Sequence, residues 1–125
     1  MVFTPSARAL GQEAEEYAKD YLLKQGYTLR ERNYRLGKGE IDLIVQKDNF
    51  LVFAEVKIRT QTAFGYPEDF VSYTQEKHYH TAATHYVETH AWKGHIRFDI
   101  IAITVENKKW DLLHLEDAFC KLLIN

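Results

Sequence analysis

The sequence contains few of the residues that interrupt or cross-link a chain. Its 125 residues include six glycines, two prolines and one cysteine. So little glycine and proline excludes a collagen-like or low-complexity chain, and 46% hydrophobic with 27% charged residues is typical of a globular domain. A single cysteine, Cys120, excludes an internal disulfide and a cysteine-based metal cluster, and favours a reducing, cytoplasmic setting.

Long apolar runs are missing too. The longest, Phe50 to Ala54, has five residues, whereas a membrane-spanning helix needs about 20. No apolar stretch follows basic residues near the N-terminus, so the sequence predicts no secretory signal. We therefore expect a protein without a membrane partner. The formal net charge of −2 argues against a uniformly basic nucleic-acid-binding protein, but leaves room for a local basic patch.

Hydrophobic periodicity predicts one α/β domain over residues 1–125. The expected elements are a helix over 4–26, strands over 27–35, 40–46 and 50–58, a helix over 74–91, strands over 96–104 and 109–115, and a turn or short helix over 116–122. This order, αβββαββ(α), predicts a sandwich with one mixed five-stranded sheet flanked by helices. The helix between the third and fourth strands permits a parallel crossover.

The first helix has recognisable ends and one apolar stripe. Thr4 and Pro5 suit its start, and Gly26 suits a left-handed residue at its end. Spacings of three and four predict a buried stripe. Its members are Leu10, Ala14, Tyr17, Ala18, Tyr21 and Leu22.

Three charged residues interrupt strands that should be apolar. Asp42 lies within the second strand, where Ile41, Leu43 and Val45 are expected on the opposite face, and Glu55 and Lys57 lie within the third. Residues two apart on a strand share a face. Pairing the two strands through a turn at 47–49 sets residue 42 opposite 54, beside Glu55. We therefore expect these three side chains to cluster.

Such a cluster is suited to hydrolytic chemistry. Adjacent carboxylates repel unless a cation compensates, and Mg²⁺ binds one or two carboxylates together with water and a substrate phosphate. A neighbouring lysine can stabilise or help deprotonate an attacking water, so the pattern favours metal-assisted phosphodiester hydrolysis. The alternative is a partly buried ion network without catalysis.

Asp42 followed by Glu55-Val56-Lys57 on paired strands resembles the PD-(D/E)XK nuclease core. The resemblance extends over nearly the whole chain to the small bacterial YraN-like family, whose fold is similar to that of archaeal Holliday-junction resolvases. The stretches that carry it are Gly11-x-x-Ala14-Glu15, Arg32-Asn33-Tyr34-Arg35, Gly39-Glu40-Ile41-Asp42, Phe64-Gly65-x-Pro67 and Arg97-Phe98-Asp99-Ile100. Ala14 departs from the family, which usually has glycine there.

The resemblance implies a restriction-endonuclease-like sandwich and a nuclease-related activity on nucleic acid, expected to be DNA, branched or single-stranded. It implies that Glu15, Asp42, Glu55 and the Val56 carbonyl hold Mg²⁺ or Mn²⁺, and that Lys57 orients the attacking water. Relatives that resolve junctions act as dimers, so a homodimer is a further expectation. Residues 24–59 carry eight basic and five acidic side chains, a local charge of +3. The residues expected to bind substrate are Arg32, Arg35, Lys38, Arg59 and Gln75, the last within Gln75-x-x-x-Tyr79.

Plainer interpretations accompany each hypothesis. Glu15 is an ordinary exposed helix charge unless the resemblance holds. Five histidines between residues 78 and 95 suggest zinc, but no two show the i, i+4 spacing of a helical site, so a solvated or nucleic-acid-facing helix is favoured. Asp99 is expected to brace an arginine rather than bind metal. For the whole domain, the alternatives to an enzyme are a non-catalytic nucleic-acid or protein interaction module and a purely structural domain.

Overall fold

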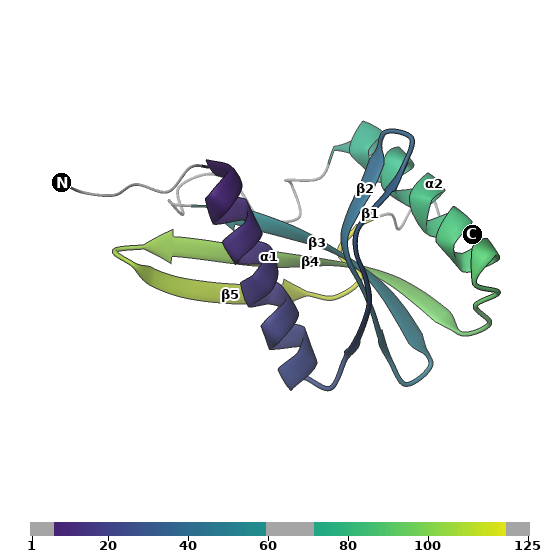
Figure 1. Cartoon of the computed structure of the whole chain (residues 1–125), viewed down its shortest axis with the longest axis horizontal. Coiled ribbons are helices and arrows are strands. Elements are labelled where there is room, and N and C mark those ends of the chain that lie inside the picture. Colours follow the sequence, from purple (N-terminus) through teal and green to yellow (C-terminus); the bar gives the residue numbers. More distant parts are fainter. Residues whose placement is uncertain (1–6, 60–71, 120–125) are drawn as a thin grey trace.

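In the computed structural model, which describes residues 7–59 and 72–119, five strands form one sheet in the order β1-β2-β3-β4-β5 (Figure 1). The elements are α1 (Ala7–Lys24), β1 (Thr28–Leu36), β2 (Gly39–Lys47), β3 (Phe50–Arg59), α2 (Tyr73–Thr89), β4 (His95–Glu106) and β5 (Lys109–Leu115). β3 and β4 are parallel and the other neighbours are antiparallel. This confirms the α/β class, the mixed five-stranded sheet and the parallel crossover.

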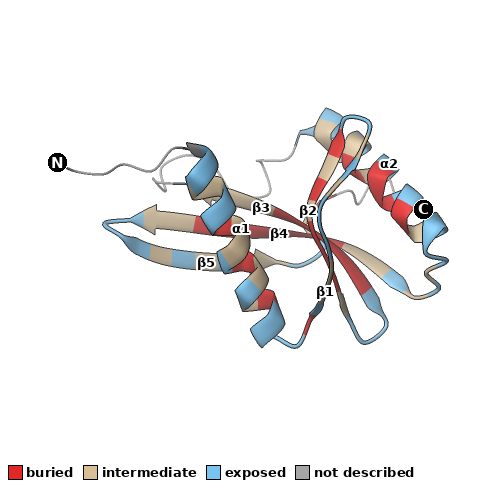
Figure 2. Ribbon diagram, viewed as in Figure 1, coloured by how far each residue is buried: buried red, intermediate tan, exposed pale blue. Residues whose placement is uncertain are grey.

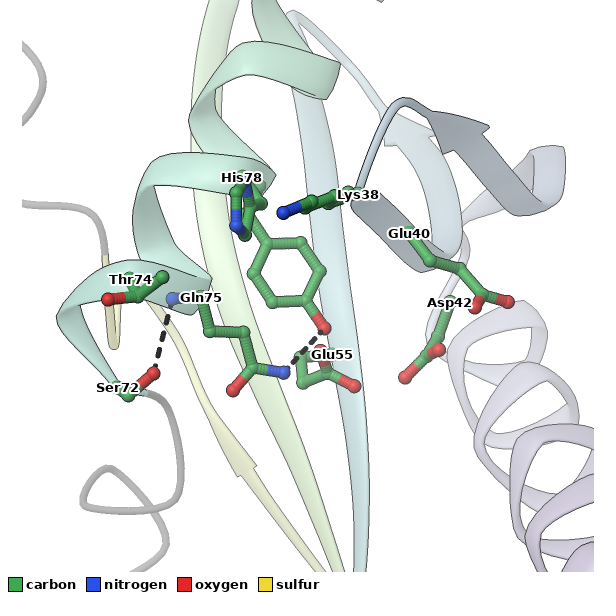
Figure 3. A pocket seen from close by; sticks show the side chains of 10 residues that line it. Lys38, Glu40, Asp42, Glu55, Ser72, Thr74, Gln75 and His78 are labelled. Carbon is green, nitrogen blue, oxygen red and sulfur yellow. Dashed lines mark hydrogen bonds between the residues drawn. The ribbon is translucent and has the colours of Figure 1, made fainter.

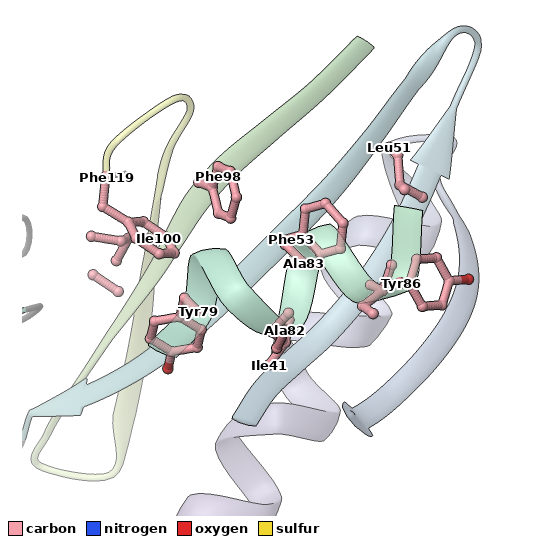
Figure 4. Close-up of a cluster of buried hydrophobic side chains, with 12 residues drawn as sticks. Ile41, Leu51, Phe53, Tyr79, Ala82, Ala83, Tyr86, Phe98, Ile100 and Phe119 are labelled. Atoms are coloured by element: carbon pink, nitrogen blue, oxygen red, sulfur yellow. The ribbon is translucent and has the colours of Figure 1, made fainter. Parts of the chain in front are cut away.

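The two helices pack against opposite faces of the sheet, and each covers its own apolar cluster. Ala82 and Tyr86 of α2 pack with Phe53 of β3 (Figure 4). Ala18 of α1 packs instead with the next strand residue, Ala54. Because successive strand residues point to opposite faces, the central strands are buried on both sides (Figure 2). A polar side chain on β2 or β3 is therefore well buried unless it lies near a strand end.

Helix α1 ends as its sequence predicts. Gly26 adopts a φ of 98°, and the Tyr27 backbone N–H donates to the Leu22 carbonyl oxygen at 3.0 Å, which closes the last turn. The expected stripe is buried at Ala14, Ala18 and Leu22. Tyr17 was also expected to be buried in this stripe, but it is 40% exposed, and its ring lies 5.1 Å from that of Trp110 on β5. The expected capping residues Thr4 and Pro5 lie outside the described residues.

The hairpin between β2 and β3 is tighter than predicted. Lys47 pairs with Phe50, so the turn consists of Asp48 and Asn49 alone, with Asp48 at a φ of 53°. Leu43 therefore faces Ala54, one residue away from the predicted register. A two-residue loop matches the twist of the flanking strands better than the three-residue loop expected from the sequence.

The expected alternation along β2 also breaks next to Asp42. Leu43 and Val45 pack beneath α1, but Ile41, expected beside them, packs beneath α2 with Ile44. The break coincides with Asn33 on β1, which lies between two paired positions and has a φ of 49°. β2 thus changes its course at the acidic residue.

The last part of the described chain turns rather than forming a helix. Residues 116–119 contain a turn, with Asp117 at a φ of 53°, so the turn is the one of the two expected forms that the described residues show, and residues 120–125 lie outside the described ones. The Phe64-Gly65-x-Pro67 motif and Cys120 also lie outside them. Neither helix within the described ranges is long and apolar enough to span a bilayer.

Asp99 braces an arginine, as the sequence predicts. It is fully buried on β4 and accepts two hydrogen bonds at 2.9 Å from the Arg97 guanidinium. His114 Nε2 lies 2.7 Å from the same carboxylate, and the Asp117 backbone N–H donates to it at 2.9 Å. This network holds the residues that follow β5 against β4. It lies on the face of the sheet that α1 covers.

Candidate functional site

A pocket of about 560 Å³ opens where the start of α2 faces β2 and β3 (Figure 3). Its lining residues are Lys38, Gly39, Glu40, Asp42, Glu55, Ser72, Thr74, Gln75, His78 and Tyr79. Four residues predicted from sequence for metal or substrate binding therefore meet in one place, namely Asp42, Glu55, Lys38 and Gln75.

Asp42 lies where β2 and β3 separate. The ladder between the strands runs from Lys47 and Phe50 to Leu43 and Ala54 and stops there. Beyond it, the Val56 backbone N–H donates to Asp42 Oδ2 at 2.8 Å, so the carboxylate replaces the missing strand partner. This bond holds Asp42 against β3, beside Glu55, and confirms that the two acidic residues are neighbours.

Glu55 is an unusual buried acid. Its residue is 4% exposed, and Oε2 has no hydrogen-bond partner among the residues that the structure describes. The pKa of Glu55 is raised to about 11, chiefly by burial and then by the hydrogen bond and the charge of the Asp42 carboxyl, against a lowering by the charge of Lys57. An ionised carboxylate here would cost several kcal/mol without a cation, so the protonated form is favoured in the metal-free protein.

Lys57 lies on the same face of β3 as Glu55 and is half-buried. Its positive charge acts on Glu55, as the cluster hypothesis requires, but the residue is not part of the pocket lining among the described residues. Val56 lies between them, and its side chain packs on the α1 side of the sheet. Its carbonyl remains a predicted metal ligand.

Glu15, on α1, lies near Asp42 but outside the main pocket. It accepts a hydrogen bond from Asn33 Nδ2 at 3.0 Å and lines a second pocket of about 350 Å³ together with Arg35 and Glu40. Burial raises the pKa of Glu15, the Asn33 hydrogen bond opposes this, and the negative charge of Asp42 raises it again. Glu15 is thus an electrostatic neighbour of Asp42 without lining the same pocket.

The donor set fits a hard divalent cation. Two adjacent carboxylates, one with a partnerless oxygen, are the oxygen ligands that Mg²⁺ and Mn²⁺ prefer. Within residues 7–59 and 72–119, no three acidic, histidine or cysteine side chains gather closely enough to hold an ion by themselves. Mg²⁺ normally retains several waters and binds through one or two carboxylates plus substrate oxygens, so a two-carboxylate site is sufficient.

The basic residues predicted to bind substrate are divided between locations. Lys38 lines the main pocket, whereas Arg35 lines the second one and forms an ion pair with Glu40 at 3.4 Å. Arg32 pairs instead with Glu16 of α1 at 2.9 Å. Arg59 is exposed at the end of β3.

Sequence reasoning placed Gln75 at the start of α2 in the site but missed its neighbours Ser72 and Thr74, which line the same pocket. Ser72 caps this helix by accepting the Gln75 backbone N–H at 3.1 Å, and Gln75 Nε2 in turn donates to the Tyr79 hydroxyl at 3.4 Å. His78, which was not among the predicted site residues, lines the pocket as well. The sequence did contain one signal for this end of α2, because Ser72 stands three residues before Gln75, which is the typical spacing of a helix N-cap.

Fold and site define a small α/β protein with a carboxylate pocket between the sheet and the start of a helix. The chain belongs to the family described as uncharacterised protein family UPF0102, whose model matches residues 14–103. It is 42% identical over 110 residues to a UPF0102 protein of Flavobacterium psychrophilum, covering 88% of this chain and 92% of the relative. A UPF0102 protein of Cytophaga hutchinsonii is 44% identical over 108 residues, covering 86% and 93%. Membership of the YraN-like family is thereby confirmed.

Proposed function

We propose that this protein is a divalent-metal-dependent endonuclease of the PD-(D/E)XK type, acting on phosphodiester bonds in branched or single-stranded DNA. The observation that carries the proposal is the buried Glu55 carboxyl with a partnerless oxygen beside Asp42. A structural ion network would pair both acids with cations, as Asp99 is paired with Arg97 on the same sheet. The absence of such a partner for Glu55 within the described chain supports a role in holding an ion.

Each residue of the site has a task in this proposal. Asp42 and Glu55 hold the ion, with the Val56 carbonyl and Glu15 as further candidates. Bound Mg²⁺ or Mn²⁺ supplies Lewis acidity to the phosphodiester and lowers the pKa of a bound water. Lys57 orients the attacking water and favours its deprotonated form.

A second candidate function is a nucleic-acid interaction module without catalysis. The placement of Lys57 favours it, because this lysine is absent from the lining of the pocket within the described residues. The net charge of −2 also favours modest rather than extensive phosphate contact. Salt-sensitive DNA binding without metal-dependent cleavage would identify this function.

The test is nicking of branched and single-stranded DNA in Mg²⁺ or Mn²⁺ by wild type, Glu55→Gln and Lys57→Ala. Matched controls are Glu106→Gln and Lys109→Ala at the β4–β5 hairpin, where both side chains are exposed. We expect the site variants to lose at least about 100-fold in rate, as general acid–base groups typically contribute 10²–10⁴-fold, and the controls to retain wild-type activity. Cleavage that survives both site substitutions would exclude this pocket as its source.

A further inference from the structure

The end of the pocket away from Glu55 carries a lysine and a histidine side chain that the proposed hydrolysis does not use. Lys38 comes from the hairpin between β1 and β2, and His78 comes from the second turn of α2. In Figure 3 the Lys38 ammonium points toward the His78 ring, at the end of the pocket away from Glu55. One pocket therefore has an acidic and a basic end.

Backbone packing fixes the position of this basic end. A Cβ added to Gly39 would lie 2.4 Å from the His78 carbonyl oxygen, so α2 is seated directly on the β2 backbone next to Lys38. The Ser72 cap adds a helix N-terminus to the same wall. Since helix N-termini and cationic side chains both attract anions, this wall is suited to a phosphate group.

We propose that Lys38 and His78, with the first turn of α2, bind a second phosphate of the substrate strand, adjacent to the phosphodiester that is cleaved. This inference rests on the proposed function. Gly39 and Asp42 are three residues apart on β2, about 10 Å at roughly 3.3 Å per residue. That backbone separation exceeds the size of one phosphate group, so the Lys38 end and the Asp42 end of the pocket are placed to contact different phosphates of one strand. The substrate is accordingly a strand that continues beyond the scissile bond.

The charges around His78 support an anion rather than a cation as occupant. Lys38 faces it from the hairpin, and Gln75 flanks it on α2. The carboxylates of the pocket, Glu40, Asp42 and Glu55, all come from β2 and β3, where the metal would neutralise two of them. A strand bound along the pocket then meets the ion at one end and the Lys38–His78 pair at the other.

The experiment compares substrates that have or lack the second phosphate. Wild type, Lys38→Gln, His78→Gln and the control Lys93→Gln are assayed on single-stranded oligonucleotides in which one phosphate next to the mapped cleavage position is a neutral methylphosphonate. Bis(p-nitrophenyl) phosphate, which has only one phosphate, serves as the second substrate. All four proteins are also compared by circular dichroism.

Neutralising the neighbouring phosphate should lower wild-type kcat/KM by about tenfold, the value of one charge-assisted hydrogen bond. Its effect should be smaller in Lys38→Gln and in His78→Gln, each of which has lost one of the two side chains that contact this phosphate, and both variants should hydrolyse bis(p-nitrophenyl) phosphate like wild type. The slope of log Kd against log salt, measured in Ca²⁺, should fall by about 0.7 in Lys38→Gln, as for one lost single-strand phosphate contact.

Equal sensitivity to the methylphosphonate in wild type and both variants would overturn the inference. If Glu55→Gln still abolished cleavage in that case, the proposed function would stand without this subsite. A wild-type protein that cleaved no oligonucleotide in any divalent metal would overturn both.

Discussion

Replacing Glu55 with glutamine should stabilise the metal-free protein. The pKa of Glu55 is raised from 4.5 to about 11 in the folded state, chiefly by burial. At pH 7 the side chain is therefore protonated when folded and ionised when unfolded. Glu55 must therefore take up a proton when the chain folds. This uptake lowers the free energy of unfolding by about 1.36 kcal/mol for each pH unit above 4.5, or by about 3 kcal/mol at pH 7. Glutamine resembles the protonated acid in shape and does not incur this cost.

The sign of the pH dependence follows from the same shift. A raised folded-state pKa means that the contribution of Glu55 to stability is fully present below about pH 4.5 and is lost as the pH rises toward 11. The difference in free energy of unfolding between Glu55→Gln and wild type should therefore be near zero at pH 4.5. It should grow with pH by about 1.36 kcal/mol per unit.

Urea unfolding followed by circular dichroism at pH 5, 6, 7 and 8 measures this difference, with a chelator present to remove divalent metal. Exposed Glu106→Gln is the matched control and should show no pH-dependent difference from wild type. A Glu55→Gln variant that is less stable than wild type, or whose difference does not change with pH, would show that Glu55 is ionised and satisfied in the folded protein.

Three further changes test the fold around the site. Gly39→Ala should lower the free energy of unfolding, measured in urea, by about 1–3 kcal/mol, because the new Cβ would clash with the His78 carbonyl oxygen and force α2 away. Unchanged stability would mean that α2 does not pack directly on the backbone at Gly39. Asp99→Asn should cost about 3–5 kcal/mol at pH 7 because it leaves Arg97 without its buried partner. Burial alone would raise the pKa of Asp99, but hydrogen bonds from His114 and Arg97 hold it below its usual value. The destabilisation caused by Asp99→Asn should therefore shrink in acid, where the wild-type carboxylate is protonated as well. A destabilisation that stays constant to low pH in urea titrations would contradict the network. Lys108→Gly should raise the melting temperature by relieving about 1 kcal/mol at a φ of 64°, and a lower value would contradict strain in that turn.

Much of the sheet could be predicted because its signals are local. Alternating apolar residues marked the strands, Gly26 marked the end of α1, and a single helix between two strands implied the parallel crossover. The same reasoning placed Asp42 beside Glu55, since a register error of one residue does not separate neighbouring strands.

Features that depend on contacts between distant parts of the chain could not be predicted from the sequence. Tyr17 fits the apolar stripe of α1 by spacing, yet it is 40% exposed and its ring lies tilted against that of Trp110 on β5. Ile41 changes faces because β2 bends where its ladder with β3 ends. The contact between His78 and Gly39 joins residues 39 positions apart, and no local pattern encodes it. The ion pair between Arg32 and Glu16 of α1 is a further contact that no local pattern encodes.

Calorimetric titration of Mn²⁺ into the metal-free protein tests most directly whether the Asp42–Glu55 pair holds an ion. Measured near pH 7 in two buffers of different ionisation enthalpy, wild type should bind one ion and release about one proton, displaced from Glu55. Asp42→Asn and Glu55→Gln should bind at least tenfold more weakly, and Glu55→Gln should release no proton. Equal binding by all three proteins, or no binding by wild type, would contradict the account.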